Sequence, residues 1–151
     1  MTKLCSACLL GINCKYDGTN NLNNKVVELS KKEVLIPVCP EQLGGEPTPR
    51  PSSGIYGGTG ADVLKSNATV RTINDGKDVT KYYTHGAEEV LKIAKMFGTK
   101  EAILKARSPS CGCGQTWQLD EKFVNHIVKG DGVTVALLKK NGIKIITEEQ
   151  L

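Results

Sequence analysis

Hydrophobic residues recur along the chain at two spacings, one typical of buried strands and the other typical of amphipathic helices. Short apolar runs predict strands at 3–10, 33–41, 101–106 and 143–147. Apolar residues three or four positions apart predict helices over 21–31, from Asp78 or Thr80 to Gly98, and over 131–140. Strands and helices therefore alternate along most of the sequence.

This alternation is typical of α/β proteins. We expect a single domain over residues 1–151, with a mostly parallel sheet flanked by helices in a Rossmann-like or flavodoxin-like, three-layer arrangement. Residues 42–62 are rich in Gly, Pro and Ser and lack periodicity, which predicts a long loop that is either functional or disordered, and residues 68–79 look like a hairpin. In sheets of this class, ligands bind beyond the carboxyl ends of the strands.

Composition narrows the classes of partner. The net charge of +4 comes from 20 basic and 16 acidic residues that are scattered along the chain, which suits a small polar or anionic ligand. Aromatic residues make up 5% of the chain and form no basic, aromatic stripe, so nucleic-acid binding is not favoured. The first residues lack the pattern of a secretory signal, and no apolar run approaches the roughly 20 residues of a membrane span. A cytoplasmic location is expected.

Six cysteines in a reducing compartment indicate metal binding or redox chemistry rather than disulfides. Cys8, Cys39 and Cys111 each come at or just after the end of a predicted strand, so they can meet in one crevice. Three thiolates would favour zinc, copper(I) or an iron–sulfur cluster over hard cations. An iron–sulfur cluster held by three cysteines keeps one iron free for a substrate.

The other cysteines leave alternatives open. Structural zinc usually needs two Cys-x-x-Cys pairs, and only Cys5 and Cys8 have that spacing. A thioredoxin-like role for this pair is weakened by its place inside an apolar strand. Cys5 is expected to be a buried structural residue, while Cys14 and Cys113 have no assigned role at this point.

Four segments together resemble a bacterial and archaeal family whose characterised members are 2-thiouracil desulfidases. They are "SACLLGINCKYDG" at 6–18, "PVCPEQLGGEPTPRP" at 37–51, "LKARSPSCG" at 104–112 and "GDGVTVALLKKNGI" at 130–143. The resemblance implies a [4Fe-4S] cluster held by three cysteines, with one iron not ligated by protein. It also implies an enzyme that removes sulfur from a small thiolated pyrimidine base without net redox change.

The resemblance places the cluster ligands at Cys8, Cys39 and Cys111, with Cys14 in reserve. It places acid/base and polar helpers at Glu41 and Ser108, both near the open iron. A thiocarbonyl sulfur is a soft donor that seeks iron, and a carboxylate such as Glu41 can deprotonate the attacking water.

Some residues and functions stay open. Arg50 either holds an acidic residue or faces an anionic ligand, and Trp117 is expected in the core, with stacking on a base as the alternative. Residues 116–126 depart from the family pattern, which leaves the substrate undecided. The rival functions are a sensing or interaction module with a structural cluster or zinc, and a sulfur carrier that uses a persulfide on Cys113.

Overall fold

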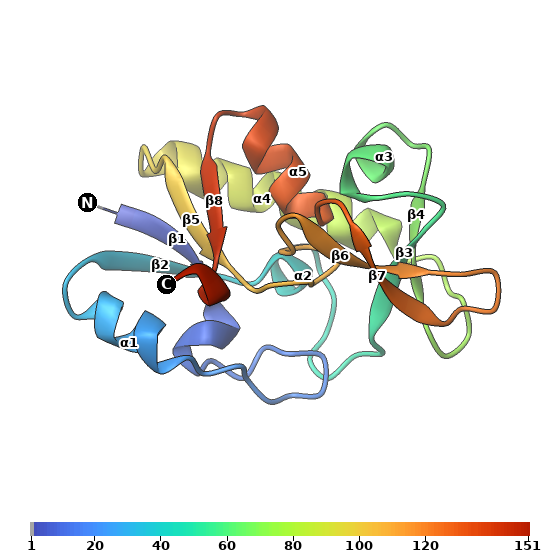
Figure 1. The fold of residues 1–151 in the computed structure, drawn as a ribbon, viewed down its shortest axis with the longest axis horizontal. Coiled ribbons are helices and arrows are strands. Elements are labelled where there is room, and N and C mark those ends of the chain that lie inside the picture. Colours follow the sequence, from blue (N-terminus) through green and yellow to red (C-terminus); the bar gives the residue numbers. More distant parts are fainter. Residues whose placement is uncertain (1) are drawn as a thin grey trace.

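A parallel sheet forms the first half of the fold. The structure, a computed structural model, describes residues 2–151, in which four strands pair in parallel in the order β2-β1-β5-β8 (Figure 1). These strands are β1 (Thr2–Ser6), β2 (Val34–Val38), β5 (Glu101–Leu104) and β8 (Lys144–Thr147). Their order and direction confirm the predicted α/β class.

Helices cover both faces of this sheet. The helices are α1 (Asn24–Ser30), α4 (Thr80–Met96) and α5 (Val133–Lys140), with short 3-10 turns at Ala7–Leu10 and Glu148–Gln150. Leu4 packs with Val90 and Leu138 from α4 and α5, whereas its neighbour Cys5 packs with Val26 from α1. Because successive residues of a strand point to opposite faces, the sheet is the middle of three layers.

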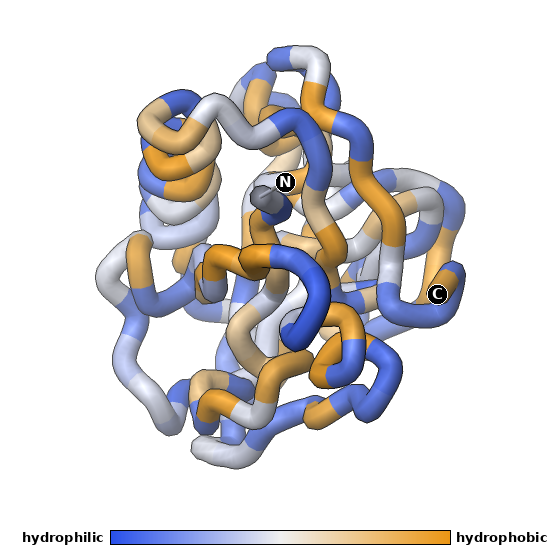
Figure 2. Tube along the Cα trace, turned by 90° about the vertical axis from the view of Figure 1, so that its left-hand side faces the viewer, coloured by the Kyte–Doolittle hydropathy of each residue, from blue (hydrophilic) through white to orange (hydrophobic). Residues whose placement is uncertain are grey.

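The two long helices form where the sequence predicts them. Asp78 accepts a hydrogen bond of 2.9 Å from the backbone nitrogen of Thr80 at the start of α4, and Gly98 follows its end with a φ of +63°. Figure 2 shows hydrophobic and hydrophilic residues alternating along the coil of α4, as an amphipathic helix requires. α1 is shorter than predicted, since the side chain of Asn23 caps its first turn.

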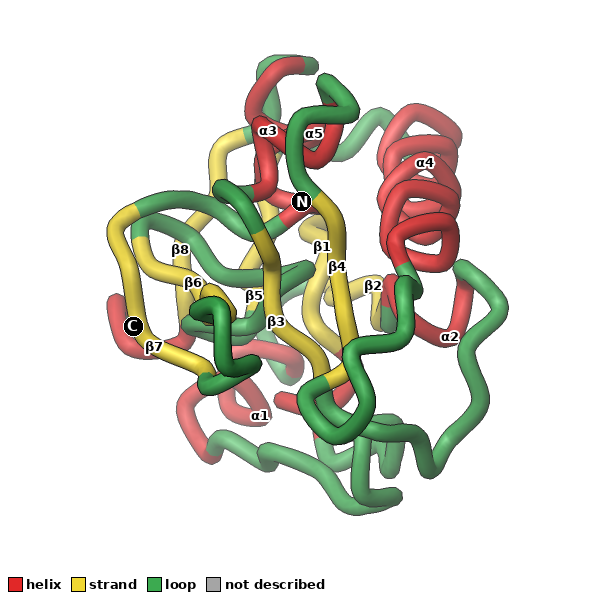
Figure 3. Tube along the Cα trace, turned by 90° about the vertical axis from the view of Figure 1, so that its right-hand side faces the viewer, coloured by secondary structure: helices red, strands yellow, loops and turns green. Residues whose placement is uncertain are grey.

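A second sheet, which the sequence analysis did not predict, stands beside the first (Figures 1 and 3). Its order is β4-β3-β6-β7, with β3 and β6 parallel and the two outer pairs antiparallel. The strands are β3 (Ser53–Tyr56), β4 (Thr69–Thr72), β6 (Gln115–Leu119) and β7 (Asn125–Lys129). The prediction of an irregular loop over 42–62 is therefore wrong, because β3 lies within it and α3 (Gly60–Leu64) begins in it.

The ends of two predicted strands also need correction. β1 ends at Ser6 and not at residue 10, because the chain turns into a 3-10 helix that Gly11 closes with a φ of +89°. β2 ends at Val38, and α2 (Pro40–Leu43) begins two residues later. Cys8 and Cys39 therefore lie on the turns that follow β1 and β2.

Glycine allows α2 to lie against α4. A Cβ atom on Gly44 would come within 1.8 Å of the Tyr82 carbonyl oxygen, and one on Gly86 within 2.0 Å of the Pro40 carbonyl oxygen. The backbones of the two helices thus touch, which fixes the position of the residues on α2. Among residues 2–151, no helix combines the length and apolar character needed to cross a bilayer.

Candidate active site

A cavity of about 450 Å³ lies between the two sheets, beyond the carboxyl ends of β1, β2 and β5. Four thiols line it, those of Cys8, Cys14, Cys39 and Cys111. The structure therefore brings together the three predicted ligands and the reserve candidate, which are up to 103 positions apart (111 − 8) in the sequence. Cys5 and Cys113 are not among the lining residues.

Three of these thiols interact directly. The thiol of Cys14 lowers the pKa of Cys8 to about 7 and also lowers the pKa of Cys39, because it hydrogen-bonds to both sulfur atoms. The pKa of Cys14 is raised by the same two contacts, and burial raises that of Cys111. Burial also raises the pKa of Cys5 to about 12, which agrees with its expected structural role.

The donor set fits an iron–sulfur cluster. Thiolates are its usual ligands, and the thiols here come from three separate segments around one cavity. Within residues 2–151, no three His, Cys, Asp or Glu side chains are arranged to hold a metal ion as a group. The cysteines of a four-iron cluster each bind a different iron, so they stand further apart than the ligands of one ion.

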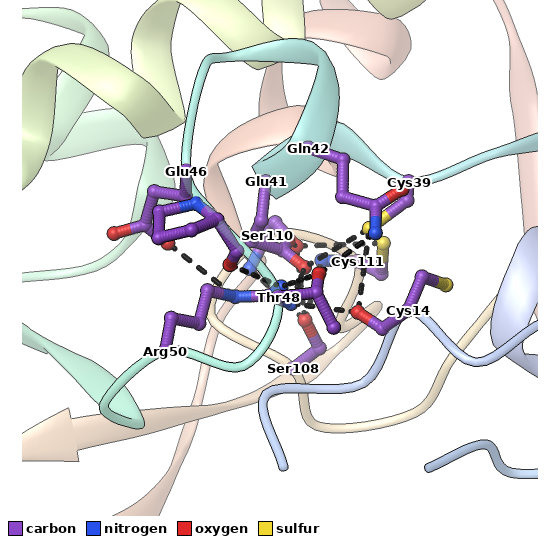
Figure 4. Close-up of polar contacts among 11 residues, drawn as sticks. Cys14, Cys39, Glu41, Gln42, Glu46, Thr48, Arg50, Ser108, Ser110 and Cys111 are labelled. Atoms are coloured by element: carbon purple, nitrogen blue, oxygen red, sulfur yellow. Dashed lines mark hydrogen bonds and ion pairs between the residues drawn. The ribbon is translucent and has the colours of Figure 1, made fainter. Parts of the chain in front are cut away.

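Glu41 extends from the first turn of α2 into this cavity (Figure 4). Its side chain is 14% exposed. One carboxylate oxygen accepts a hydrogen bond from the Ser110 hydroxyl, and the other lies 3.2 Å from Arg50 Nη2 and 3.8 Å from Cys39 Sγ. The carboxylate is therefore fixed beside a candidate ligand of the cluster.

Arg50 holds two acidic residues, the first of the two roles expected for it. Its side chain is 5% exposed, and Nη2 also donates to the carbonyl oxygen of Cys14 at 3.0 Å. Its Nε lies 3.4 Å from a carboxylate oxygen of Glu46, whose pKa burial raises to about 7. The guanidinium group thus joins Glu41, Glu46 and the Cys14 loop.

Replacing Arg50 by methionine is expected to destabilise the fold by about 3–5 kcal/mol, because Glu41 and Glu46 lose the cation that compensates their burial. Anaerobic urea titration measures this loss. The matched control is Lys31→Met, which removes an ion pair with Glu28 whose side chains are both 64% exposed. That control is expected to cost less than about 1 kcal/mol. Equal stabilities of the two variants would contradict the structural role of Arg50.

Two serines connect Glu41 with Cys111. Ser108 Oγ accepts hydrogen bonds from the backbone nitrogens of Ser110 at 3.2 Å and Cys111 at 3.1 Å, and lies 3.0 Å from Ser110 Oγ. Ser110, which the sequence analysis missed, contacts both Glu41 and Cys111 Sγ, the latter at 3.5 Å. The sequence did contain a signal for Ser110, since it lies two residues after Ser108 and directly before Cys111 in "SPSC".

The first turn of α5 positions this serine loop. The backbone nitrogen of Val133 donates to the carbonyl oxygen of Pro109 at 2.8 Å, and that of Thr134 donates to the carbonyl oxygen of Ser110 at 2.9 Å. Free N–H groups at the start of a helix therefore bind the loop backbone and leave the serine side chains for the cavity.

The second sheet contributes the opposite side of the cavity. Ser53 of β3, Trp117 of β6 and Asn125 of β7 line it. The expectation that Trp117 lies in the core is wrong, because its side chain remains 36% exposed at the cavity. Sequence reasoning gave no role to Ser53 or Asn125.

Comparisons with known proteins identify the family of the chain. A family model described as 2-thiouracil desulfurase matches residues 4–150, nearly the whole chain. The chain belongs to the 2-thiouracil desulfurase family. This confirms the resemblance stated from the sequence, together with the expected class of enzyme, a desulfurase.

Two relatives of this desulfurase-family chain are similar over most of its length. The uncharacterized protein YbbK of Bacillus subtilis (strain 168) is 42% identical over 148 residues, which cover 98% of this chain and 96% of YbbK. The solved structure of the [4Fe-4S]-dependent thiouracil desulfidase TudS is 36% identical and superposes with a TM-score of 0.83. That match covers 99% of this chain and 92% of TudS.

Proposed function

We propose that this desulfurase-family chain is a [4Fe-4S]-dependent desulfidase that converts a thiolated pyrimidine base such as 2-thiouracil into uracil and hydrosulfide. The supporting observation is that Glu41, fixed by Arg50 and Ser110, shares one cavity with four thiols. Such a cavity combines soft ligands for iron with a carboxylate for proton transfer.

Cys8, Cys39 and Cys111 would hold the cluster, because they come from the turns after three neighbouring strands. Cys14 is the alternative to Cys8, since its thiol lies between those of Cys8 and Cys39. When bound, the cluster would supply an iron without a protein ligand, a Lewis acid that attracts the thiocarbonyl sulfur and withdraws electrons from the adjacent carbon.

Glu41 would act as the general base. It takes one proton from water as the water oxygen bonds to the thiocarbonyl carbon. The C–S bond then breaks, a C=O bond replaces it, and sulfur leaves as hydrosulfide with the second proton of the water. No electrons enter or leave, and the proton on Glu41 passes to solvent.

The neighbours of Glu41 would keep it in place for this step. Arg50 and the Ser110 hydroxyl each bind one of its two carboxylate oxygens, so the side chain cannot rotate freely. Ser108 is within hydrogen-bond distance of Ser110 and would assist as a polar helper at the same wall.

Anaerobic reconstitution followed by incubation with 2-thiouracil tests this function. We expect about four irons per chain and equal amounts of hydrosulfide and uracil, without added reductant. Iron or zinc binding without release of hydrosulfide would contradict the proposal and favour a sensing module. The rival role as a sulfur carrier on Cys113 has no support from the cavity, because Cys113 does not line it.

A further inference from the structure

We propose that Asn125 and Trp117 bind the pyrimidine ring, and that the Asn125 amide pairs with the N–H and C=O groups adjacent to the thiocarbonyl. This inference rests on the proposed function and names the groups that recognise its substrate. Together with Ser53, these residues form the base wall, the side of the cavity that faces the thiols.

The two sides of the cavity come from different sheets. The thiols and Glu41 follow strands of the first sheet, whereas the base wall lies on β3, β6 and β7 of the second. If the sulfur atom of a ligand approaches the thiols, the part of the ligand opposite that sulfur therefore faces the second sheet. A flat ring spans such a gap between two walls.

Asn125 has unused hydrogen-bonding capacity at this wall. Its side-chain oxygen is buried and has no hydrogen-bond partner among residues 2–151, and its amide nitrogen makes one long bond of 3.4 Å to the Ser53 carbonyl oxygen. Ser53 Oγ is also buried without a hydrogen bond, although the Tyr83 hydroxyl is near enough to interact with it. A buried polar atom without a partner costs free energy, which a ligand with matching groups would recover.

Gly54 makes room for the Asn125 side chain. A Cβ atom at position 54 would lie 2.0 Å from Asn125 Oδ1, so any larger residue would displace the amide. The Asn125 amide therefore packs against the backbone of β3, which limits its movement.

Trp117 supplies an aromatic surface at the same wall. Its backbone nitrogen donates to the Arg107 carbonyl oxygen at 3.1 Å, which ties β6 to the loop after β5. The residue is 36% exposed and lines the cavity. Stacking of a nucleobase on such a ring is favourable for every base, so Trp117 provides affinity and Asn125 provides selectivity.

The chemistry of the base matches an amide. In 2-thiouracil a ring N–H lies between the C=S and C=O groups, so the edge beside the sulfur presents a donor and then an acceptor. An asparagine amide presents an acceptor and a donor side by side and can form two parallel hydrogen bonds with this edge. Pyrimidine-2-thione has the same C=S group and one ring N–H beside it, but it lacks the carbonyl, so it can form only one of these two hydrogen bonds.

A comparison of these two substrates tests the inference on the reconstituted enzyme. Asn125→Ala is expected to lower kcat/KM for 2-thiouracil by about 10–100-fold and to lower kcat/KM for pyrimidine-2-thione by a clearly smaller factor. Asn125→Asp keeps the shape of the side chain but cannot donate a hydrogen bond. It is expected to lose the same preference for 2-thiouracil over pyrimidine-2-thione. The matched control is Asn141→Ala, an exposed asparagine that donates to the Leu137 carbonyl oxygen and is outside the cavity lining.

Uracil affinity, measured by calorimetry on the same proteins, gives a readout that does not need turnover. Asn125→Ala is expected to weaken uracil binding by about 10–100-fold. Equal losses with both thiones, or unchanged uracil affinity, would overturn the role of Asn125. If the wild-type protein binds uracil through Asn125 but releases no hydrosulfide, the proposed function fails and the recognition site stands.

Discussion

Cys39→Ser is expected to reduce both the iron content and the release of hydrosulfide to background. Cys39 directly follows β2, and its sulfur contacts the Cys14 carbonyl oxygen and Glu41 at 3.8 Å each. A serine hydroxyl is a hard, poorly acidic donor and does not replace a thiolate on iron. Iron analysis and visible absorbance after anaerobic reconstitution, followed by the hydrosulfide assay, measure the effect.

Cys113→Ser is the matched control for this loss. Cys113 has comparable half-buried exposure but its sulfur faces the Ile145 carbonyl oxygen, outside the cavity lining. It is expected to keep full iron content. Loss of iron in Cys113→Ser, with retention in Cys39→Ser, would refute the ligand assignment. The pair Cys8→Ser and Cys14→Ser then identifies the third ligand, which we expect to be Cys8.

Glu41→Gln is expected to keep the cluster and to lower kcat by about 10²–10⁴-fold, the usual range for loss of a general acid or base. Glutamine retains the size of glutamate and a hydrogen-bonding oxygen for Arg50, but it cannot accept the proton of the attacking water. Single-turnover release of hydrosulfide, at equal iron content, measures the loss.

Glu46→Gln is the matched control for Glu41. Glu46 lies on the other side of Arg50 and is buried, and its pKa of about 7 means that the native protein already populates the neutral form that glutamine resembles. We expect this variant to keep its turnover. Normal turnover by Glu41→Gln would rule out Glu41 as the base.

The positions of the thiols could be predicted because they depend on the parallel strands. β1, β2 and β5 are short apolar runs, and parallel strands share one carboxyl edge, so Cys8, Cys39 and Cys111 meet there wherever the intervening chain goes. Glu41 and Ser108 followed from the family resemblance, and both lie in the cavity lining. Their roles remain predictions that the variants above test.

The second sheet could not be predicted in the same way. Its strands have four or five residues, and two of the four residues of β3 are Ser53 and Gly54, which carry little strand signal. β6 pairs with β3 across about 60 residues of sequence, a contact that local periodicity does not reveal, and β7 joins the sheet only through β6. The error on Trp117 has this origin, since its exposure depends on where β6 lies.

The same two helices, α4 and α5, pack behind both sheets: Val90 and Val135 belong to the core of the first, and Ala87 and Val133 to that of the second. The gap between the thiols and the base wall therefore has one shared backing of two helices. On the proposed function, exchanging side chains on β6 and β7 would change which ring is accepted, while the thiols and Glu41 beside the first sheet would be retained. Selectivity and reactivity would then be separable in this scaffold.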